Sequence, residues 1–99
     1  MVIIWSIPAR KDLQLIHQYI AHDSKLYAKH VIRDITNKVE VLLELPRIGK
    51  IVAEIGEDNV REISIYSYRI MYELIGEVIY IHGIIHKRRH FMPEDLHRD

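Results

Sequence analysis

Apolar residues recur at helical spacing through the first half of the chain. They stand at Ala9, Leu13, Ile16 and Ile20, and then at Ala28, Ile32, Ile35, Val39 and Leu42. Positions three or four apart lie on one face of an α-helix, so each set predicts an amphipathic helix. Ser6 offers an N-cap to the first helix, and Ser24 or Asp23 offers one to the second. The short break between the helices favours an antiparallel helical hairpin.

The second half of the chain changes to a period of two and is rich in Ile, Val and Tyr. Its strand candidates are Val60 to Ile65, Tyr68 to Ile75 and Val78 to Ile85, and a further strand, Val2 to Trp5, opens the chain. The connections at Tyr66-Ser67 and Gly76-Glu77 are so short that they force antiparallel hairpins. The predicted order is β-α-α-β-β-β. This is an α+β fold in which an N-terminal helical hairpin packs on one face of a small, mostly antiparallel sheet.

Length and composition indicate one soluble domain. The 99 residues contain no repeat or linker, so we predict a single domain over residues 1–99. Apolar residues make up 48% and charged residues 28%, and no apolar run approaches the roughly 20 residues that cross a bilayer. The absence of cysteine excludes disulfides, thiol catalysis and thiolate metal sites. We therefore expect a cytoplasmic protein without a membrane partner.

The charges balance overall but are unevenly distributed. Fourteen basic and fourteen acidic side chains give a net charge of zero, which argues against a free-standing, sequence-independent DNA binder. The stretch "IIHKRRHF" nevertheless runs from an apolar strand into His86, Lys87, Arg88, Arg89 and His90. No carboxylate occurs between Val78 and Pro93. The stretch is either a local basic site for phosphate or acidic groups, or a hydrated strand end with surface ion pairs.

Strand alternation limits which groups can meet this basic stretch. On the last strand, His82, Ile84 and His86 are predicted to share one face. Opposed side chains on neighbouring antiparallel strands lie about 5 Å apart. The basic end of the strand therefore lies beside either Arg61 or Arg69, and the sequence leaves the register open.

Two kinds of chemistry can be considered for these residues. Residues four apart on a strand are separated by roughly 13 Å, so His82, His86 and His90 cannot share a zinc ion unless the chain folds back after His86. We predict no metal site and no cofactor. Cleavage of RNA would need a proton-transfer group, for which His86 or His90 is the candidate. The candidate cations at the phosphate are Arg61, Arg69, Lys87, Arg88 and Arg89.

Five segments in order resemble the RelE/ParE superfamily of toxins from type II toxin–antitoxin modules. "WSIPARKDL" resembles its Ser-x-x-Ala-x-x-Asp-Leu opening, and "IHQYI" resembles the usual continuation. "LPRIGK" is similar to its Leu-Pro-x-x-Gly, "VREISIYSYRIMYEL" to its central hairpin, and "IIHKRRHF" to its closing His-x-x-Arg through His86 and Arg89. The resemblance runs from about residue 2 to residue 91. Its last two segments are more similar to ParE and the plasmid-stabilisation proteins than to RelE.

The ParE resemblance implies a growth inhibitor that acts on DNA gyrase and is neutralised by a cognate antitoxin. The target-binding surface would then comprise Arg61, Arg69, His86, Lys87, Arg88 and Arg89. The C-terminal segment of the antitoxin would wrap the toxin, with a groove between the helices and the sheet edge as a seat for apolar anchors. A homodimer and a toxin–antitoxin hetero-oligomer both remain open.

The superfamily also implies two alternatives. One is a ribosome-dependent endoribonuclease that cuts messenger RNA, with His86 as acid/base and with Arg61 and Arg89 on the scissile phosphate. The catalytic tyrosine of such enzymes has no clear counterpart here, because Phe91 occupies the approximate region and lacks a hydroxyl. The other is an inactive module that binds the antitoxin and acts as a co-repressor.

Overall fold

The computed structural model describes residues 1–96 and 98. Its elements are β1 (Val2–Trp5), α1 (Ile7–Ala21), α2 (Lys25–Glu40), the 3-10 helix η1 (Val41–Leu43), β2 (Lys50–Ile51), β3 (Val60–Ile65), β4 (Tyr68–Ile75), β5 (Val78–His86) and the 3-10 helix η2 (Pro93–Asp95). The α+β fold and its β-α-α-β-β-β order are confirmed. The two-residue strand β2 is an addition that the sequence did not predict.

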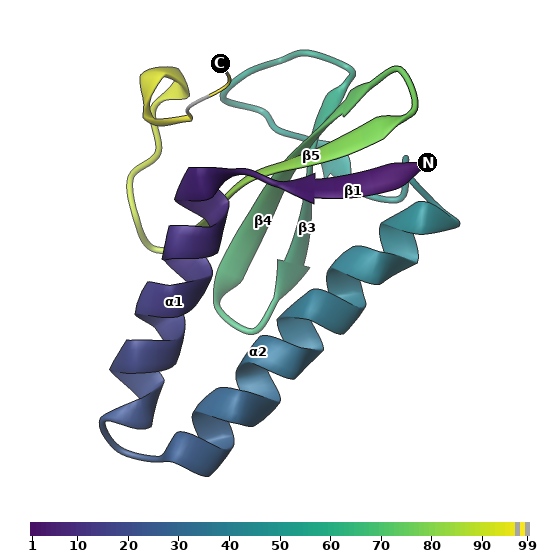
Figure 1. The fold of residues 1–99 in the computed structure, drawn as a ribbon. Coiled ribbons are helices and arrows are strands. Elements are labelled where there is room, and N and C mark those ends of the chain that lie inside the picture. The colour runs from purple at the N-terminus through teal and green to yellow at the C-terminus, as the bar shows by residue number, and fades with distance from the viewer. Residues whose placement is uncertain (97, 99) are drawn as a thin grey trace.

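The strands form one sheet in the order β1-β5-β4-β3-β2. Strand β1 runs parallel to β5, and the other neighbours are antiparallel. The two helices form an antiparallel hairpin that packs on one face of this sheet (Figure 1). No helix within the described residues is long and apolar enough to cross a membrane.

Serine caps begin both helices where the sequence placed them. The Ser6 hydroxyl accepts from the Ala9 N–H at 3.1 Å, and the Ser24 hydroxyl accepts from the Tyr27 N–H at 3.1 Å. Each cap satisfies one main-chain donor that the first turn of a helix leaves unpaired. Helix α2 buries one stripe, consisting of Ala28, Val31, Ile35 and Val39.

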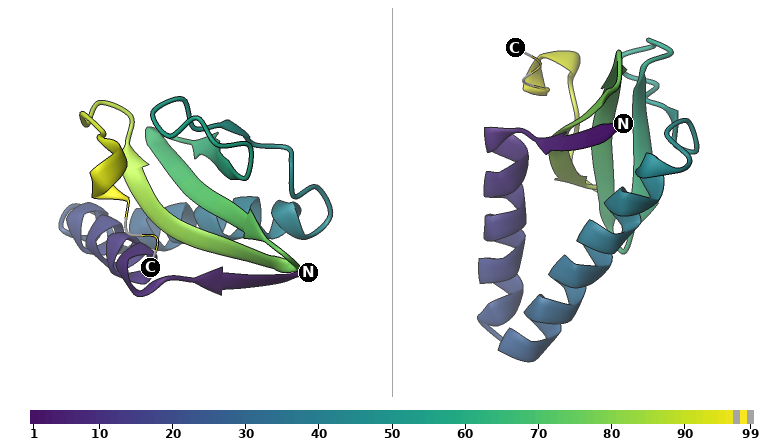
Figure 2. Two further views of the ribbon diagram at one scale, coloured as in Figure 1. Left: turned by 90° about the horizontal axis from the view of Figure 1, so that it is seen from above. Right: turned by 45° about the vertical axis from the view of Figure 1, so that its right-hand side comes forward.

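The sheet is covered on both faces. The larger core lies between the helices and the sheet and includes Ile35, Leu42, Ile70 and Ile81. A smaller core on the opposite face contains Val52, Val60, Met71, Ile85, Phe91 and Leu96. Phe91 and Leu96 bring the C-terminal segment to this second core, and Val52 brings the loop before β3. Figure 2 shows both segments beside the sheet. The sequence predicted the helical layer but not this second cover.

A β-bulge changes the alternation of the last strand. Met71 pairs with Gly83, but Tyr72 pairs with Ile81, so His82 is the extra residue. Ile81 and Ile84 both belong to the core on the helix side, whereas the His82 ring stacks on Tyr80 at 6.3 Å between ring centroids. The prediction that His82 shares a face with Ile84 and His86 is therefore wrong.

The segment after η1 is attached to the sheet by Tyr72. The hydroxyl of this fully buried residue donates to the Pro46 carbonyl at 2.7 Å and accepts from the Gly49 N–H at 3.0 Å. A Cβ at Gly49 would lie 2.6 Å from both the Glu62 carbonyl oxygen and the Tyr72 hydroxyl. Glycine therefore permits the close approach that lets β2 pair with β3.

Replacing Tyr72 by phenylalanine tests this attachment. The Gly49 N–H would lose its partner in a buried place, which typically costs about 1–3 kcal/mol. Urea unfolding of Tyr72→Phe should show that loss in the free energy of unfolding. The control Tyr19→Phe, at a side chain with 79% exposure, should change it little. Equal effects of the two substitutions would contradict this role for Tyr72.

Candidate functional site

Strand β5 ends at His86 and leads directly into the basic cluster, which we define as His86, Lys87, Arg88, Arg89 and His90. All five residues are exposed. The structure describes seven ion pairs, and none of them includes a member of this cluster. Its three adjacent cations are therefore exposed, and no described ion pair engages them.

The main chain of the basic cluster is held in place. The Lys87 N–H donates to the Ser67 carbonyl at 2.8 Å, and the Arg89 N–H donates to the His86 carbonyl at 2.9 Å. The turn before Ser67 is itself attached to α2, because the Tyr66 hydroxyl donates to the Asp34 carboxylate. Tyr66 has a φ of 52°, in the left-handed region that residues other than glycine seldom adopt. These hydrogen bonds therefore fix the main chain at the start of the basic cluster.

Arg69 lies next to the basic cluster, but its guanidinium is already bound by carboxylates of the fold. Its guanidinium donates to Glu62 at 2.9 and 2.7 Å and to Glu54 at 2.9 and 2.8 Å. Glu62 is only 4% exposed. The two carboxylates, Glu62 first, raise the pKa of Arg69, and the hydrogen bond from Arg69 lowers the pKa of Glu54. This arrangement neutralises Arg69 within the fold.

The pairing of β4 with β5 determines which arginine lies beside the basic end of β5. Arg69 is paired with Ile85, the residue before His86, and lines the same surface hollow as Lys87. Its guanidinium also lies 5.6 Å from the centre of the Phe91 ring, a cation–π contact. Arg69 is therefore the neighbour of the cluster.

Arg61 lies elsewhere and organises the loop before β3. It is paired with Tyr72 across the sheet, and its side chain is 14% exposed. Its guanidinium donates to the Gly49 carbonyl at 2.9 Å and to the Asp58 carbonyl at 2.9 Å, and it forms an ion pair with the Asp58 carboxylate at 3.0 Å. The structure does not bring Arg61 together with His86 and Arg89.

The two histidines of the basic cluster have different surroundings. Nδ1 of His86 accepts from the Arg88 N–H at 3.1 Å, so the neutral ring carries its proton on Nε2. The His86 ring also meets Tyr68 edge to face at 5.7 Å. His90 contacts the Met92 sulfur at 3.1 Å. No carboxylate among the described residues orients either ring, so the arrangement favours recognition over proton transfer.

A second polar group, which the sequence did not indicate, surrounds the bulge residue His82. Nε2 of His82 lies 2.9 Å from Glu73, and Glu73 also accepts from Arg98 at 3.0 and 2.8 Å. Arg98 in turn pairs with Glu57. Arg98 first, and then His82, lowers the pKa of Glu73. Strand alternation could not reveal this group, because the bulge that turns His82 toward Glu73 arises only from strand pairing.

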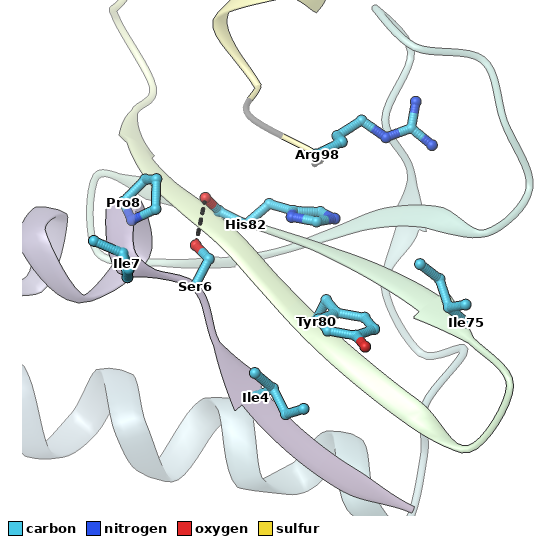
Figure 3. A pocket seen from close by; sticks show the side chains of 8 residues that line it. All are labelled: Ile4, Ser6, Ile7, Pro8, Ile75, Tyr80, His82 and Arg98. Carbon is cyan, nitrogen blue, oxygen red and sulfur yellow. Dashed lines mark hydrogen bonds between the residues drawn. The ribbon is translucent and has the colours of Figure 1, made fainter.

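This group borders a hollow with a volume of about 490 Å³ (Figure 3). Its lining residues are Ile4, Ser6, Ile7, Pro8, Ile75, Tyr80, His82 and Arg98. The walls are mostly apolar, and the charged groups at its edge are paired with one another. Among the described residues, no group of three His, Cys, Asp or Glu side chains could hold a metal ion.

Substitution of Arg69 separates its role from that of the basic cluster. In Arg69→Met, Glu62 would stay buried without its cation, which typically costs about 3–5 kcal/mol. The control Arg88→Met removes an exposed cation with no ion pair in the described structure and should change stability by less than about 0.5 kcal/mol. Urea unfolding of both variants measures the difference. Near-equal stabilities would contradict the structural role of Arg69.

Comparison with known proteins agrees with this fold. The sequence model described as "ParE toxin of type II toxin-antitoxin system, parDE" matches residues 3–91. A chain from the chromosomal ParDE TA system of P. aeruginosa is similar in structure, with a TM-score of 0.72 and 21% sequence identity over 87% of this chain and 95% of that chain. No curated protein matches the chain. Because the family match covers most of its length, this chain belongs to the ParE toxin family of type II toxin–antitoxin systems, as the sequence resemblance predicted.

Proposed function

We propose that this toxin inhibits growth by acting on DNA gyrase and that it meets this target through the basic cluster. The observation that carries the proposal is a contrast between two groups of basic residues. Arg61, Arg69 and Arg98 are held by carboxylates of the fold, whereas Lys87, Arg88 and Arg89 form no described ion pair. We therefore place the target-binding surface at residues 86–89 and give Arg61 and Arg69 a supporting role.

The chemistry of the basic cluster suits an acidic or phosphate-rich target. Arginine binds carboxylate and phosphate through two parallel hydrogen bonds, and lysine adds a mobile point charge. Gyrase works on DNA, so its complexes present phosphate groups as well as acidic side chains. The cluster would meet them without first breaking an ion pair of its own.

We further propose that a cognate antitoxin neutralises the toxin within a hetero-oligomer. Acidic side chains of the antitoxin would occupy part of the basic cluster and so compete with the target. The ParE family membership supports a protein partner of this kind.

An endoribonuclease is the second candidate, and His86 is the observation that favours it. The ring lies beside three cations, and its Nε2 is the atom left to exchange a proton when Nδ1 accepts from Arg88. Against it, Phe91 is buried at 4% exposure and has no hydroxyl, and Arg61 lies across the sheet from the cluster.

Reversing one charge in the basic cluster tests the gyrase proposal. Arg89→Glu places a carboxylate against an acidic or phosphate surface, so inhibition of supercoiling by purified gyrase should weaken by at least about tenfold. Lys29→Glu, the same charge change at an exposed position of α2, should leave inhibition unchanged. Full inhibition by Arg89→Glu would remove the basic cluster from the target surface.

Replacing His86 by glutamine distinguishes recognition from catalysis. The substitution keeps polarity and approximate size but removes the imidazole. If the cluster only recognises gyrase, growth inhibition should persist within severalfold. If His86 transfers protons in RNA cleavage, cleavage of ribosome-bound messenger RNA should fall by about 10²–10⁴-fold. A loss of that size would favour the nuclease.

A further inference from the structure

The hollow of Figure 3, which we call the β1 hollow, is lined by aliphatic side chains from three elements of the fold. Ile4 lies on β1, Ile7 begins α1 and Ile75 ends β4, and their exposed fractions are 43%, 76% and 50%. A volume of about 490 Å³ falls in the range of pockets that hold small organic molecules. A ligand that covers these exposed aliphatic groups would remove them from water, which favours binding.

Two of the polar side chains in the β1 hollow already have partners. The Ser6 hydroxyl donates to the His82 carbonyl at 3.2 Å and also caps α1. Arg98 forms ion pairs with Glu57 and Glu73. A charged ligand would therefore find no unpaired counterion among the described lining residues. Because an unpaired charge is costly to take out of water, the β1 hollow favours a neutral ligand.

His82 supplies a polar atom that has no partner. Its side chain is 6% exposed and extends from β5 between those of Tyr80 and Arg98 (Figure 3). Nε2 lies 2.9 Å from the ionised Glu73 carboxylate, which can only accept, so the neutral ring carries its proton on Nε2. Nδ1 is then an acceptor, and it is buried without a hydrogen-bond partner among the described residues. A ligand that donates to Nδ1 would remove the free-energy cost of this unpaired group.

The aromatic wall of the β1 hollow is Tyr80. Its ring stacks on the His82 ring with 6.3 Å between centroids and an interplanar angle of 10°. Tyr80 is only half-buried, so its ring can turn at the border with solvent and admit a flat ligand to Nδ1 of His82. Aromatic rings also stack favourably on one another, so Tyr80 favours an aromatic ligand.

We propose that the β1 hollow binds a small neutral aromatic molecule that carries one N–H or O–H donor. The donor bonds to Nδ1 of His82, the ring lies beside Tyr80, and the apolar edge of the ligand covers Ile4 and Ile75. This site goes beyond the toxin–antitoxin role. It does not depend on gyrase as the target, because none of its lining residues belongs to the basic cluster.

Indole and N-methylindole are matched probes for this chemistry, because they share a ring system and only indole has an N–H donor. Each is titrated into the ¹⁵N-labelled protein and followed by NMR. Indole should bind with a Kd of about 1 mM or lower, with amide shifts centred on Ile4, Ile75 and Tyr80. The Nδ1 resonance of His82 should move as that atom accepts a hydrogen bond, and N-methylindole should bind about tenfold more weakly. Equal affinities, an unmoved Nδ1 resonance, or no shifts with indole at several millimolar would overturn the proposal.

A pair of tryptophan substitutions locates the bound probe. Ile75→Trp fills the β1 hollow and should abolish indole binding. The control Ile51→Trp makes the same change at a position with 42% exposure on β2, at the opposite edge of the sheet, and should leave binding unchanged. Indole binding that survives Ile75→Trp, or that is lost in Ile51→Trp, would place the probe outside the β1 hollow and contradict the assignment.

Replacing His82 by phenylalanine tests the role of Nδ1. The substitution keeps an aromatic ring but removes the acceptor, while Glu73 keeps Arg98 as its cation. His82→Phe should therefore bind indole and N-methylindole with equal affinity. A preference for indole that persists in this variant would show that another group accepts the N–H and would contradict the proposal. The comparison of the two probes on the unmodified protein tests the same hydrogen bond if His82→Phe does not fold.

Discussion

One buried carboxylate constrains the whole second face of the sheet. Glu62 is 4% exposed within β3, and a charge in that place is tolerated only with a cation and further hydrogen bonds. Arg69 supplies both from β4, and its remaining donors reach Glu54 of the loop before β3. The same guanidinium lies against the Phe91 ring of the C-terminal segment. Two strands, a loop and the C-terminal segment therefore meet at one arginine.

The cations of the chain therefore fall into two groups, those that bind partners within the fold and those that remain exposed. Arg69 and Arg61 are committed to carboxylates and carbonyls of the fold, so a target would have to compete with those partners for them. Residues 87–89 begin where the sheet ends, and none of the described ion pairs includes them. A protein with no net charge can thus present a locally basic surface, because its charges are unevenly distributed along the chain.

Much of the fold follows from local signals in the sequence. The helical stripes, the serine caps at Ser6 and Ser24 and the short turns each depend on neighbouring residues, and all of them appear in the structure. The bulge at His82 depends instead on pairing between β4 and β5, so alternation along one strand predicted the wrong face. The cover of the second face depends on Phe91 and Leu96 packing against strands far away in the sequence.

The candidate site was predictable to a similar extent. The basic cluster is contiguous in the sequence, and its exposure follows from its composition. The engagement of Arg69 by Glu62 and Glu54 needs both the hairpin register and the position of the preceding loop. The short strand β2, which ends at Ile51, pairs with β3, and the periodicity of the chain did not indicate it.

We propose that this ParE-family chain stops growth through gyrase and not by cutting messenger RNA. The most direct measurement follows DNA supercoiling and transcript integrity in the same cells after induced expression of the toxin. If the toxin acts on gyrase, supercoiling is lost, or gyrase-linked DNA breaks appear, while transcripts are still intact. Rapid cleavage of transcripts with normal supercoiling would contradict it.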